Sequence, residues 1–441
     1  MDLKILSLIG IFLGMACLIY LIFRGISILI VAPLAAAVIA LFSGENIVAM
    51  LTGPYIEGFV DFAKNNFFIF FFSAIFGKLM GECGAAQSIA YKFSRVVKKL
   101  PQKYQKVAAV LSLVLLSLTF TLCGISAFVV VFTLVVIARK LFEEMDVPWR
   151  FYTCAPLGSG VIAQSMIPGT PSVHNLIPTQ YLGTTPTAAP TIGIICAIVA
   201  ACIGTVYITH IIRKAERAGE GFLPSGELIK KTDMIADEDP KIPLLKCFLP
   251  SILLLVTLNI LKQDAVTALV VGIIAIYIVF YKTLKGKMIK ALTAGAQNSI
   301  NTVVSVCSTV GFGVVATSVA GYDFLLTALN NIPGPPIVQM IVAINVCAGV
   351  SGSSSGGLGI AFSTMTDQFL ASGLNPEVIH RVAVIASCGL DSLPHTNGLI
   401  TDLSVTKLTH RQAYAHYGFL TVVTPLICVT IAAILAELGI V

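Results

Sequence analysis

The sequence predicts an all-α polytopic membrane protein built from two inverted repeats. Three observations support this prediction: the apolar composition, the recurrence of apolar segments of membrane-spanning length, and residue patterns that return in the second half. Of the 441 residues, 56% are hydrophobic and only 11% are charged, whereas a soluble domain usually has about 25% charged residues. The net charge of +6 does not gather in a basic stripe interleaved with aromatics, so we expect no nucleic-acid partner.

Apolar segments that we interpret as single membrane spans recur along the chain. They are residues 3–23, 26–42, 67–80, 187–211, 244–261, 265–281, 300–320 and 413–435. A charged stretch, residues 213–243, separates the two halves. The 11 cysteines are scattered through apolar segments without a C-x-x-C pair, a pattern that predicts packing residues rather than disulfides or metal ligands.

The two halves share residue types at nearly constant separations, which indicates an internal repeat. Each match is weak alone, but their order and spacing are consistent. The pairs are Gly124/Gly352, Ser126/Ser354, Pro148/Pro376 and Ser159/Ser387, separated by 228 positions (352 minus 124), and Pro168/Pro394, Thr170/Thr396 and Leu182/Leu408, separated by 226 (394 minus 168).

Equivalent loops of the repeat differ in charge. Residues 91–106 hold six basic side chains and no acidic one, whereas the equivalent residues 319–334 hold no basic side chain and one acid, Asp323. Lys and Arg collect on the cytoplasmic side of membrane proteins. We therefore predict that these loops lie on opposite sides, which makes the repeat inverted.

Residues 107–140 and 336–371 are predicted to be re-entrant helical hairpins that do not cross the membrane. Residues 107–140 are apolar but interrupted at 121–126, and basic residues flank both ends. Each arm of about 16 residues rises about 24 Å, less than the roughly 30 Å hydrocarbon core. The second tip lies in GVSGSSSGGLG, residues 349–359. Non-helical backbone at membrane depth is tolerated only inside protein or beside a wet cavity.

The predicted organisation has five transmembrane helices and one hairpin in each half. The first half is residues 1–212, with its hairpin at 107–140 and a broken helix at 149–182. Residues 213–243 are the cytoplasmic linker. The second half is residues 244–441, with its hairpin at 336–371 and a broken helix at 376–408. Both termini are then expected outside the cell.

The non-helical breaks are expected to hold the binding site. Facing breaks near the membrane midplane form the substrate sites of many secondary transporters, and the helix N-termini after them favour an anion. For the serines, threonines and asparagines, the alternative is capping of freed backbone groups. The candidate substrate-binding residues are Gly124, Ser126, Thr170, His174, Asn175, Gly352, Ser353, Ser354, His395, Thr396 and Asn397.

Asp391, His174 and His395 are the candidates for handling a coupling ion. An acid in a broken membrane segment is costly unless it is paired, protonated or functional. Histidine changes charge near neutral pH. The alternatives are that Asp391 caps a half-helix and that the histidines are satisfied core residues.

The stretch FGKLMGECGAAQ at residues 76–87, together with residues 124–148, 168–178 and 391–408, resembles the gluconate permease (GntP) family of the ion transporter superfamily. The resemblance runs from about Asn65 to Tyr417. It implies a carrier that imports small hydroxycarboxylates, such as gluconate or 3-hydroxybutyrate, usually with protons and often as a dimer. The segment SLPHTNG at residues 392–398 is more similar to the hydroxybutyrate-type branch, which favours a smaller monocarboxylate.

The sequence therefore predicts a proton-coupled symporter of small organic carboxylates. We expect a homodimer in the bacterial inner membrane, with the lipid bilayer and the carboxylate as partners and no cofactor beyond the coupling ion. Alternatives are a sodium-coupled symporter, a channel, and an intramembrane hydrolase that uses Ser354 or Ser159 with a histidine. For the hydrolase, the strand-to-helix turn that activates a serine nucleophile is not predicted.

Overall fold

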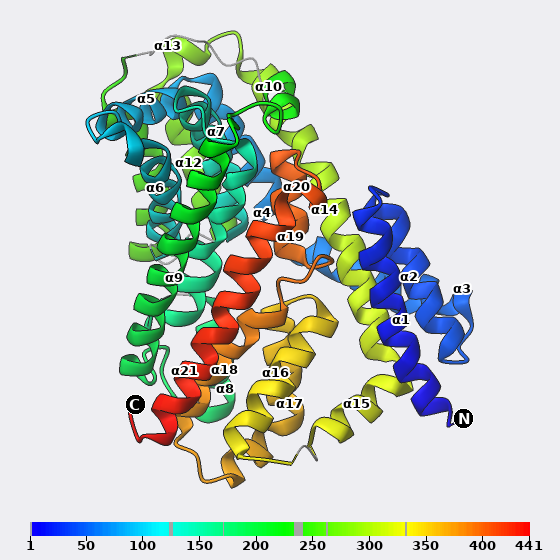
Figure 1. Cartoon of the computed structure of the whole chain (residues 1–441). Helices are drawn as coiled ribbons and strands as arrows, with labels where there is room; N and C mark the ends of the chain where they lie inside the picture. Colours follow the sequence, from blue (N-terminus) through cyan, green and yellow to red (C-terminus); the bar gives the residue numbers. More distant parts are fainter. Residues whose placement is uncertain (1, 123–126, 171, 233–240, 262, 331–332) are drawn as a thin grey trace.

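Every regular element in the described part of the chain is helical, which confirms the predicted fold class. The computed structural model describes residues 2–122, 127–170, 172–232, 241–261, 263–330 and 333–441. Within these ranges, six helices are long and apolar enough to cross a membrane. Both chain termini lie at the end of the molecule opposite the linker helix α10 (Figure 1).

The first half of the chain leads from α1 to α9, and the linker contains α10 (Glu227–Thr232). The elements of this half are α1 (Leu3–Phe23), α2 (Ile28–Phe42), α3 (Ile47–Met50), η1 (Leu51–Tyr55), α4 (Ile56–Glu82), α5 (Ala85–Val97), α6 (Gln102–Leu122), α7 (Ala127–Glu144), η2 (Trp149–Cys154), η3 (Leu157–Met166), α8 (Val173–Leu182) and α9 (Pro190–Arg217).

The second half leads from α11 to α21. Its elements are α11 (Leu244–Leu255), η4 (Val256–Ile260), α12 (Ala265–Val279), α13 (Tyr281–Leu284), α14 (Met288–Ser318), α15 (Ala320–Asn330), α16 (Pro336–Ser351), α17 (Ser354–Ala371), α18 (Pro376–Leu390), α19 (Asn397–Thr406), α20 (His410–Gly418), η5 (Phe419–Val423) and α21 (Thr424–Glu437).

The order of elements is the same in both halves. A pair of apolar helices is followed by a long helix, a short helix, a helical hairpin, a broken segment and a last long helix. Two pairs of corresponding helices have equal lengths: α2 and α12 each have 15 residues, and α7 and α17 each have 18. The symmetry relation between the halves, and the end that faces the cytoplasm, stay predictions.

The two helical hairpins open toward opposite ends of the molecule (Figure 1). The hairpin of α6 and α7 opens at the end that carries α5 and α10, where Lys98 pairs with Glu144 and Lys106 with Asp146, each at 3.2 Å. The hairpin of α16 and α17 opens at the other end. The tip of the second hairpin therefore points into the middle of the molecule.

Residues 91–97 are helical, which corrects the interpretation of residues 91–106 as a loop. They form the second part of α5. Ile89, Phe93 and Val97, spaced four residues apart, place their side chains toward the core, while Arg95 and Val96 are exposed. This spacing is that of an amphipathic helix, and the basic residues of its polar face had suggested a loop.

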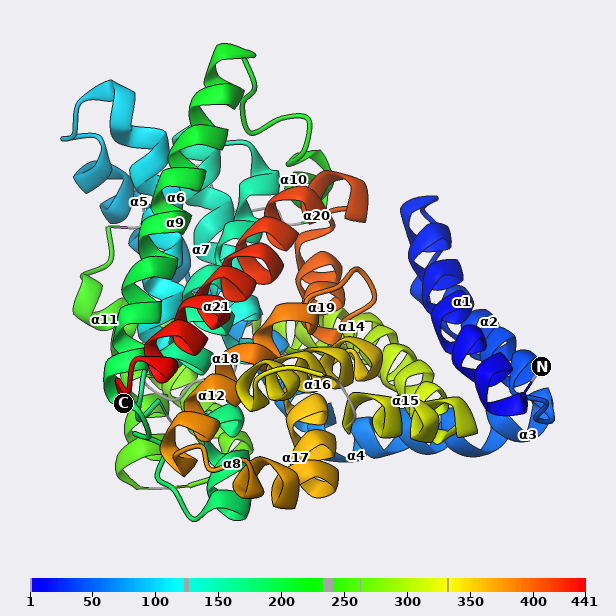
Figure 2. The ribbon, with the colours of Figure 1, turned by 60° about the horizontal axis from the view of Figure 1, so that its bottom comes forward.

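The helices α1 and α2 stand at the edge of the molecule (Figure 2), where they pack against α15 and α14. The long helix α14 continues from this edge into the centre. A Cβ atom at Gly313 would lie 2.8 Å from the Ser351 carbonyl oxygen, so the glycine lets α14 approach the tip of the second hairpin. Phe312 beside it packs edge-on against His395, with ring centroids 5.9 Å apart.

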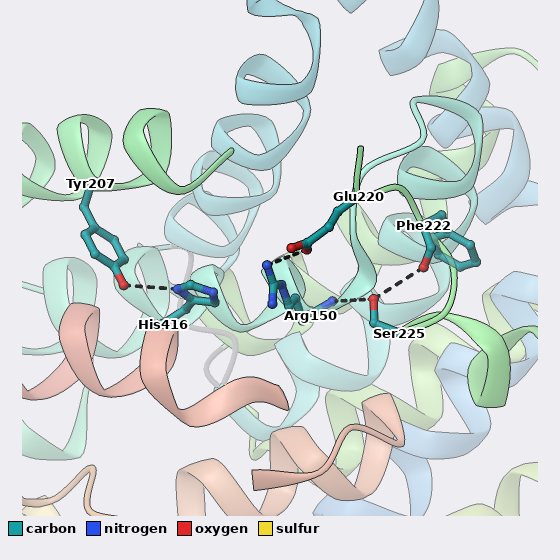
Figure 3. Close-up of polar contacts among 6 residues, drawn as sticks. All are labelled: Arg150, Tyr207, Glu220, Phe222, Ser225 and His416. Atoms are coloured by element: carbon teal, nitrogen blue, oxygen red, sulfur yellow. Dashed lines mark hydrogen bonds and ion pairs between the residues drawn. The ribbon is translucent and has the colours of Figure 1, made fainter. Parts of the chain in front are cut away.

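An ion pair and a hydrogen bond connect the linker to the start of the first broken segment. The Arg150 guanidinium donates to the Glu220 carboxylate at 2.5 Å, and the Arg150 backbone N–H donates to Ser225 Oγ at 3.4 Å. In the same region, a hydrogen bond of 3.1 Å between the Tyr207 hydroxyl and His416 Nδ1 joins α9 to α20 (Figure 3). The linker, α9 and α20 thus meet at one end of the molecule.

Candidate functional site

The tip of the second hairpin is a tight turn between two helices. The helix α16 ends at Ser351, and Gly352 follows in the left-handed conformation with φ of 66°. Ser353 caps α17 by accepting a hydrogen bond from the Gly356 N–H at 3.2 Å. A Cβ atom at Gly352 would lie 3.4 Å from the His395 ring. That distance is an ordinary van der Waals contact, so it is the left-handed backbone conformation that favours glycine here.

A hydrogen bond between His174 and Ser354 joins the two halves of the chain at this tip. His174 Nε2 and Ser354 Oγ lie 2.6 Å apart. His174 is in the first turn of α8, which Ser172 caps by accepting from the Asn175 N–H at 3.3 Å. The other ring nitrogen, His174 Nδ1, is buried and makes no hydrogen bond to the described residues. It is therefore available to a ligand.

The second broken helix meets the same tip. The Asn397 N–H donates to the Gly352 carbonyl at 3.4 Å, and His395 Nε2 donates to the Gly349 carbonyl at 3.0 Å. Asn397 Oδ1 and His395 Nδ1 are buried without a hydrogen-bond partner in the described chain. Buried polar atoms usually have a hydrogen-bond partner. A polar ligand bound at this place could supply the partners that these two atoms lack.

Asp391 lies directly after α18, beside the tip. Its carboxylate accepts a hydrogen bond of 2.8 Å from Ser392 Oγ and also interacts with the Ser354 side chain. Asp391 remains half-buried rather than enclosed, and no cation pairs with it among the residues that the structure describes. The carboxyl group is therefore placed where both a proton and a bound solute could reach it.

Thr170 and Thr396 occupy equivalent positions in the two breaks and make equivalent hydrogen bonds. The Thr170 hydroxyl donates to the Ile167 carbonyl at 3.0 Å, and the Thr396 hydroxyl donates to the Leu393 carbonyl at 2.9 Å. Both side chains are buried. In this structure the two hydroxyls satisfy freed backbone groups.

Asn175 is turned toward a buried arginine. Its amide nitrogen donates to the Thr170 carbonyl at 3.1 Å, and its oxygen accepts from Arg381 Nη1 at 2.8 Å. Of the predicted site residues, the structure brings together His174, Gly352, Ser354, Asp391, His395 and Asn397, with Ser353 as the cap of α17. Gly124 and Ser126 lie outside the described residues.

Arg381 was missed by the sequence reasoning. It is fully buried in α18 and donates to the carbonyls of Ala188 at 3.0 Å and Pro186 at 2.9 Å. It therefore fixes the connection between α8 and α9 against the second broken helix. Its position in an apolar segment was the available signal, because charged residues in membrane segments have partners or functions.

Ser354 and His174 have the spacing of a nucleophile and its base, but the pair lacks the third member of a catalytic triad. In a triad, a carboxylate holds the other ring nitrogen of the histidine. Here His174 Nδ1 has no partner in the described part of the chain, and Asp391 approaches the serine instead. This geometry disfavours the hydrolase alternative.

The fold is that of a polytopic membrane protein, and its similarity to a known transporter makes the chain a membrane transporter. The chain is 30% identical over 483 aligned residues to the uncharacterized transporter YxjC of Bacillus subtilis (strain 168), covering 99% of this chain and 100% of that protein. The chain belongs to the family of this transporter. No protein-family model matches the chain.

The YdaH transporter of Alcanivorax borkumensis is a solved structure with some likeness to this chain. The two are 14% identical with a TM-score of 0.35, over 89% of this chain and 88% of that one.

Proposed function

We propose that the protein is a secondary active transporter that imports a small organic carboxylate together with protons. The observation that carries the proposal is the contact of 2.6 Å between His174 and Ser354, made across the two halves beside the half-buried Asp391. A site shared by two halves changes shape when the halves move relative to each other, as alternating access requires.

The site suits an anion. The N-terminal ends of α8 and α17 meet where His174 contacts Ser354, and α19 begins at Asn397 beside Gly352. Helix N-termini present free N–H groups and partial positive charge. The hydroxyl of Ser354 and the unpaired atoms of His174 and Asn397 add polar groups for a substrate such as gluconate or 3-hydroxybutyrate.

Coupling follows from the charge of Asp391. A substrate carboxylate and an ionised Asp391 in the same site would repel each other, because like charges disfavour each other's charged form. Binding of the anion and protonation of Asp391 therefore favour each other. With His174 and His395 neutral, the loaded site carries only the substrate's single charge. We place this symporter in the bacterial inner membrane, as a homodimer similar to the gluconate permease family.

Uptake into proteoliposomes tests the proposal. The purified protein is reconstituted in sodium-free buffer, and accumulation of labelled 3-hydroxybutyrate and gluconate is followed with an imposed pH gradient, acid outside. The proposal predicts saturable accumulation of at least one of them that a protonophore abolishes. Accumulation that needs Na⁺ and ignores the pH gradient would indicate the sodium-coupled alternative, and unsaturable downhill flux would indicate a channel.

A further inference from the structure

We propose that Arg381 is the fixed counter-charge of the site, which allows the carrier to change its access in two electrically neutral forms, one loaded and one empty. The inference rests on the proposed function and adds to it the charge that the substrate must have. Arg381 belongs to the second half of the chain, and its side chain lies against the first broken segment.

Arg381 is a buried cation within the apolar helix α18. Its side chain is 0% exposed. A charged side chain in a membrane segment is costly unless it is paired or functional, and a guanidinium keeps its proton in proteins. Arg381 therefore places a permanent positive charge inside the protein.

The guanidinium lies beside the first turn of α8. Its Nη1 atom donates to Asn175 Oδ1 at 2.8 Å, and Asn175 directly follows His174, whose ring contacts Ser354. Nη1 also donates to the Ser165 carbonyl, at 3.5 Å, near the end of η3. Arg381 thus contacts both sides of the first break, and its charge lies next to the site.

No carboxylate pairs with Arg381 in the part of the chain that the structure describes. Its other hydrogen bonds go to the carbonyl oxygens of Ala188 at 3.0 Å and Pro186 at 2.9 Å, which carry no net charge. Glu377, one turn earlier in α18, is exposed and accepts from the Ala189 N–H at 3.4 Å. Because solvent screens an exposed charge, the charge of Arg381 remains uncompensated inside the protein.

The elements that pack against α18 add no buried carboxylate. These elements are α8, α16, α17, α21, η3 and η5. The acids in their described residues are Asp367 of α17 and Glu437 of α21, and both are exposed. The buried counter-charge of Arg381 must therefore come from elsewhere.

The remaining buried titratable groups near Arg381 and Asp391 are counted as neutral. His380 Nδ1 lies 2.7 Å from the Thr184 hydroxyl, and a second cation beside Arg381 would be repelled. Asp402 of α19 is 2% exposed, and its Oδ1 atom has no hydrogen-bond partner in the described chain, so its ionised form is disfavoured. The charge of the site is then set by Arg381, Asp391 and the substrate.

Both complete states of the site are neutral. In the empty site, the positive charge of Arg381 is offset by an ionised Asp391. In the loaded site, Asp391 holds a proton, and the negative charge of a monocarboxylate offsets Arg381. Binding of the substrate alone would leave one excess negative charge, and binding of the proton alone would leave one excess positive charge.

This balance of charge couples the proton to the substrate. Moving an unbalanced charge through a region of low dielectric constant is costly, so the two neutral states change their access readily and the two half-loaded states are held back. One fixed cation also balances only one negative charge. The substrate class that fits is therefore the monocarboxylates rather than the dicarboxylates.

Membrane potential is a direct probe, because it acts only on steps that move charge. Wild-type protein in sodium-free proteoliposomes receives the same pH gradient at zero potential and at about −100 mV inside, set with K⁺ and valinomycin. We expect equal initial uptake of labelled 3-hydroxybutyrate or gluconate at both potentials. We also expect no sustained current when the substrate is added.

The variant Arg381→Gln removes the charge and keeps a side chain that can donate hydrogen bonds. Its loaded form carries one negative charge, so exchange of labelled for unlabelled substrate should slow and should depend on the potential. One charge moved across about 100 mV changes the ratio of inward-facing to outward-facing loaded carriers by up to about 50-fold.

Two further variants separate charge from structure. Arg381→Lys keeps the charge but loses the planar fork of donors, so its exchange should be independent of the potential even where its stability falls. Arg411→Gln removes an exposed arginine of α20 and should behave like the wild type.

Dicarboxylate analogues test the substrate class. Malate is 3-hydroxybutyrate with a carboxylate in place of the methyl group, and glucarate is gluconate with a carboxylate in place of the terminal hydroxymethyl group. The analogue of the transported substrate should inhibit labelled uptake only at higher concentrations than the unlabelled monocarboxylate does. Equal inhibition by the two would contradict a site with a single fixed counter-charge.

A sustained current through the wild type, or exchange by Arg381→Gln that is as fast as in the wild type and independent of the potential, would overturn the inference and leave the proposed function standing. If Arg381→Gln fails to fold, exchange that depends on the potential in the wild type or in Arg381→Lys would overturn it. A wild-type protein without proton-driven uptake would instead refute the proposed function itself.

Discussion

His174 and Ser354 come from different halves of the chain, and the hydrogen bond between their side chains joins the two halves directly within the site. Their hydrogen bond of 2.6 Å is partly buried, and each side chain replaces a hydrogen bond that the other would otherwise make to water. The bond therefore contributes both to stability and to the shape of the binding site.

We expect His174→Ala and Ser354→Ala each to lower stability by about 1 kcal/mol, the usual net value of a hydrogen bond, and to weaken substrate binding. In the double variant the losses should be less than additive, because both changes remove the same bond. Thermal unfolding of the purified proteins measures this coupling. His210→Ala, which changes an exposed histidine of α9, serves as the control, and strictly additive losses would contradict the contact.

The sequence identified some residues of this site and missed others for a physical reason. Asp391, His174 and Asn397 stand beside prolines that interrupt apolar segments, so a local pattern reveals them. Arg381 lies inside a continuous helix, where the surrounding apolar residues hide one charge in the average hydropathy. The carbonyls that surround it belong to Pro186 and Ala188, which are distant in the sequence.

At the scale of elements, the second hairpin depends on how closely α16 and α17 approach. A Cβ atom at Gly357 would lie 2.4 Å from Ala348 Cα, whereas one at Gly359 would meet no neighbour within 4 Å. The two glycines lie in the same helix, two residues apart, and differ in their contacts with the rest of the hairpin.

This difference gives a matched pair of variants. Gly357→Ala should destabilise the protein by about 1–3 kcal/mol, because overpacking forces the two helices apart. Gly359→Ala should be neutral or stabilise the protein by up to about 1 kcal/mol, because alanine favours a helix. Thermal unfolding of both variants in the same detergent checks the prediction, and equal shifts for the two would contradict the close packing.

Long apolar helices were well predicted from the sequence, and amphipathic ones were not. The predicted span of residues 3–23 coincides with α1, because nothing in its sequence interrupts the apolar run. The predicted span of residues 67–80 is only the end of α4, which begins at Ile56. Polar residues such as Asp61 and Lys64 shortened the prediction, although they occupy exposed positions of a continuous helix.

At the scale of the whole molecule, the proposed transport site requires two halves that enter the membrane from opposite sides. The hairpin of α6 and α7 opens at the end with the linker, and the hairpin of α16 and α17 opens at the other end (Figure 1). The short helices that precede them, α5 and α15, carry opposite charge. The inverted arrangement therefore predicts that these two helices face different compartments.

Labelling from outside intact cells tests this claim most directly. Lys99→Cys and Asp323→Cys change exposed residues after α5 and in α15, and a membrane-impermeant thiol reagent is applied, with the native cysteines of the wild type as background. We predict that the reagent labels position 323 in intact cells and position 99 only after the membrane is permeabilised. Labelling of both positions from the same side would contradict the inverted arrangement and the transport site built on it.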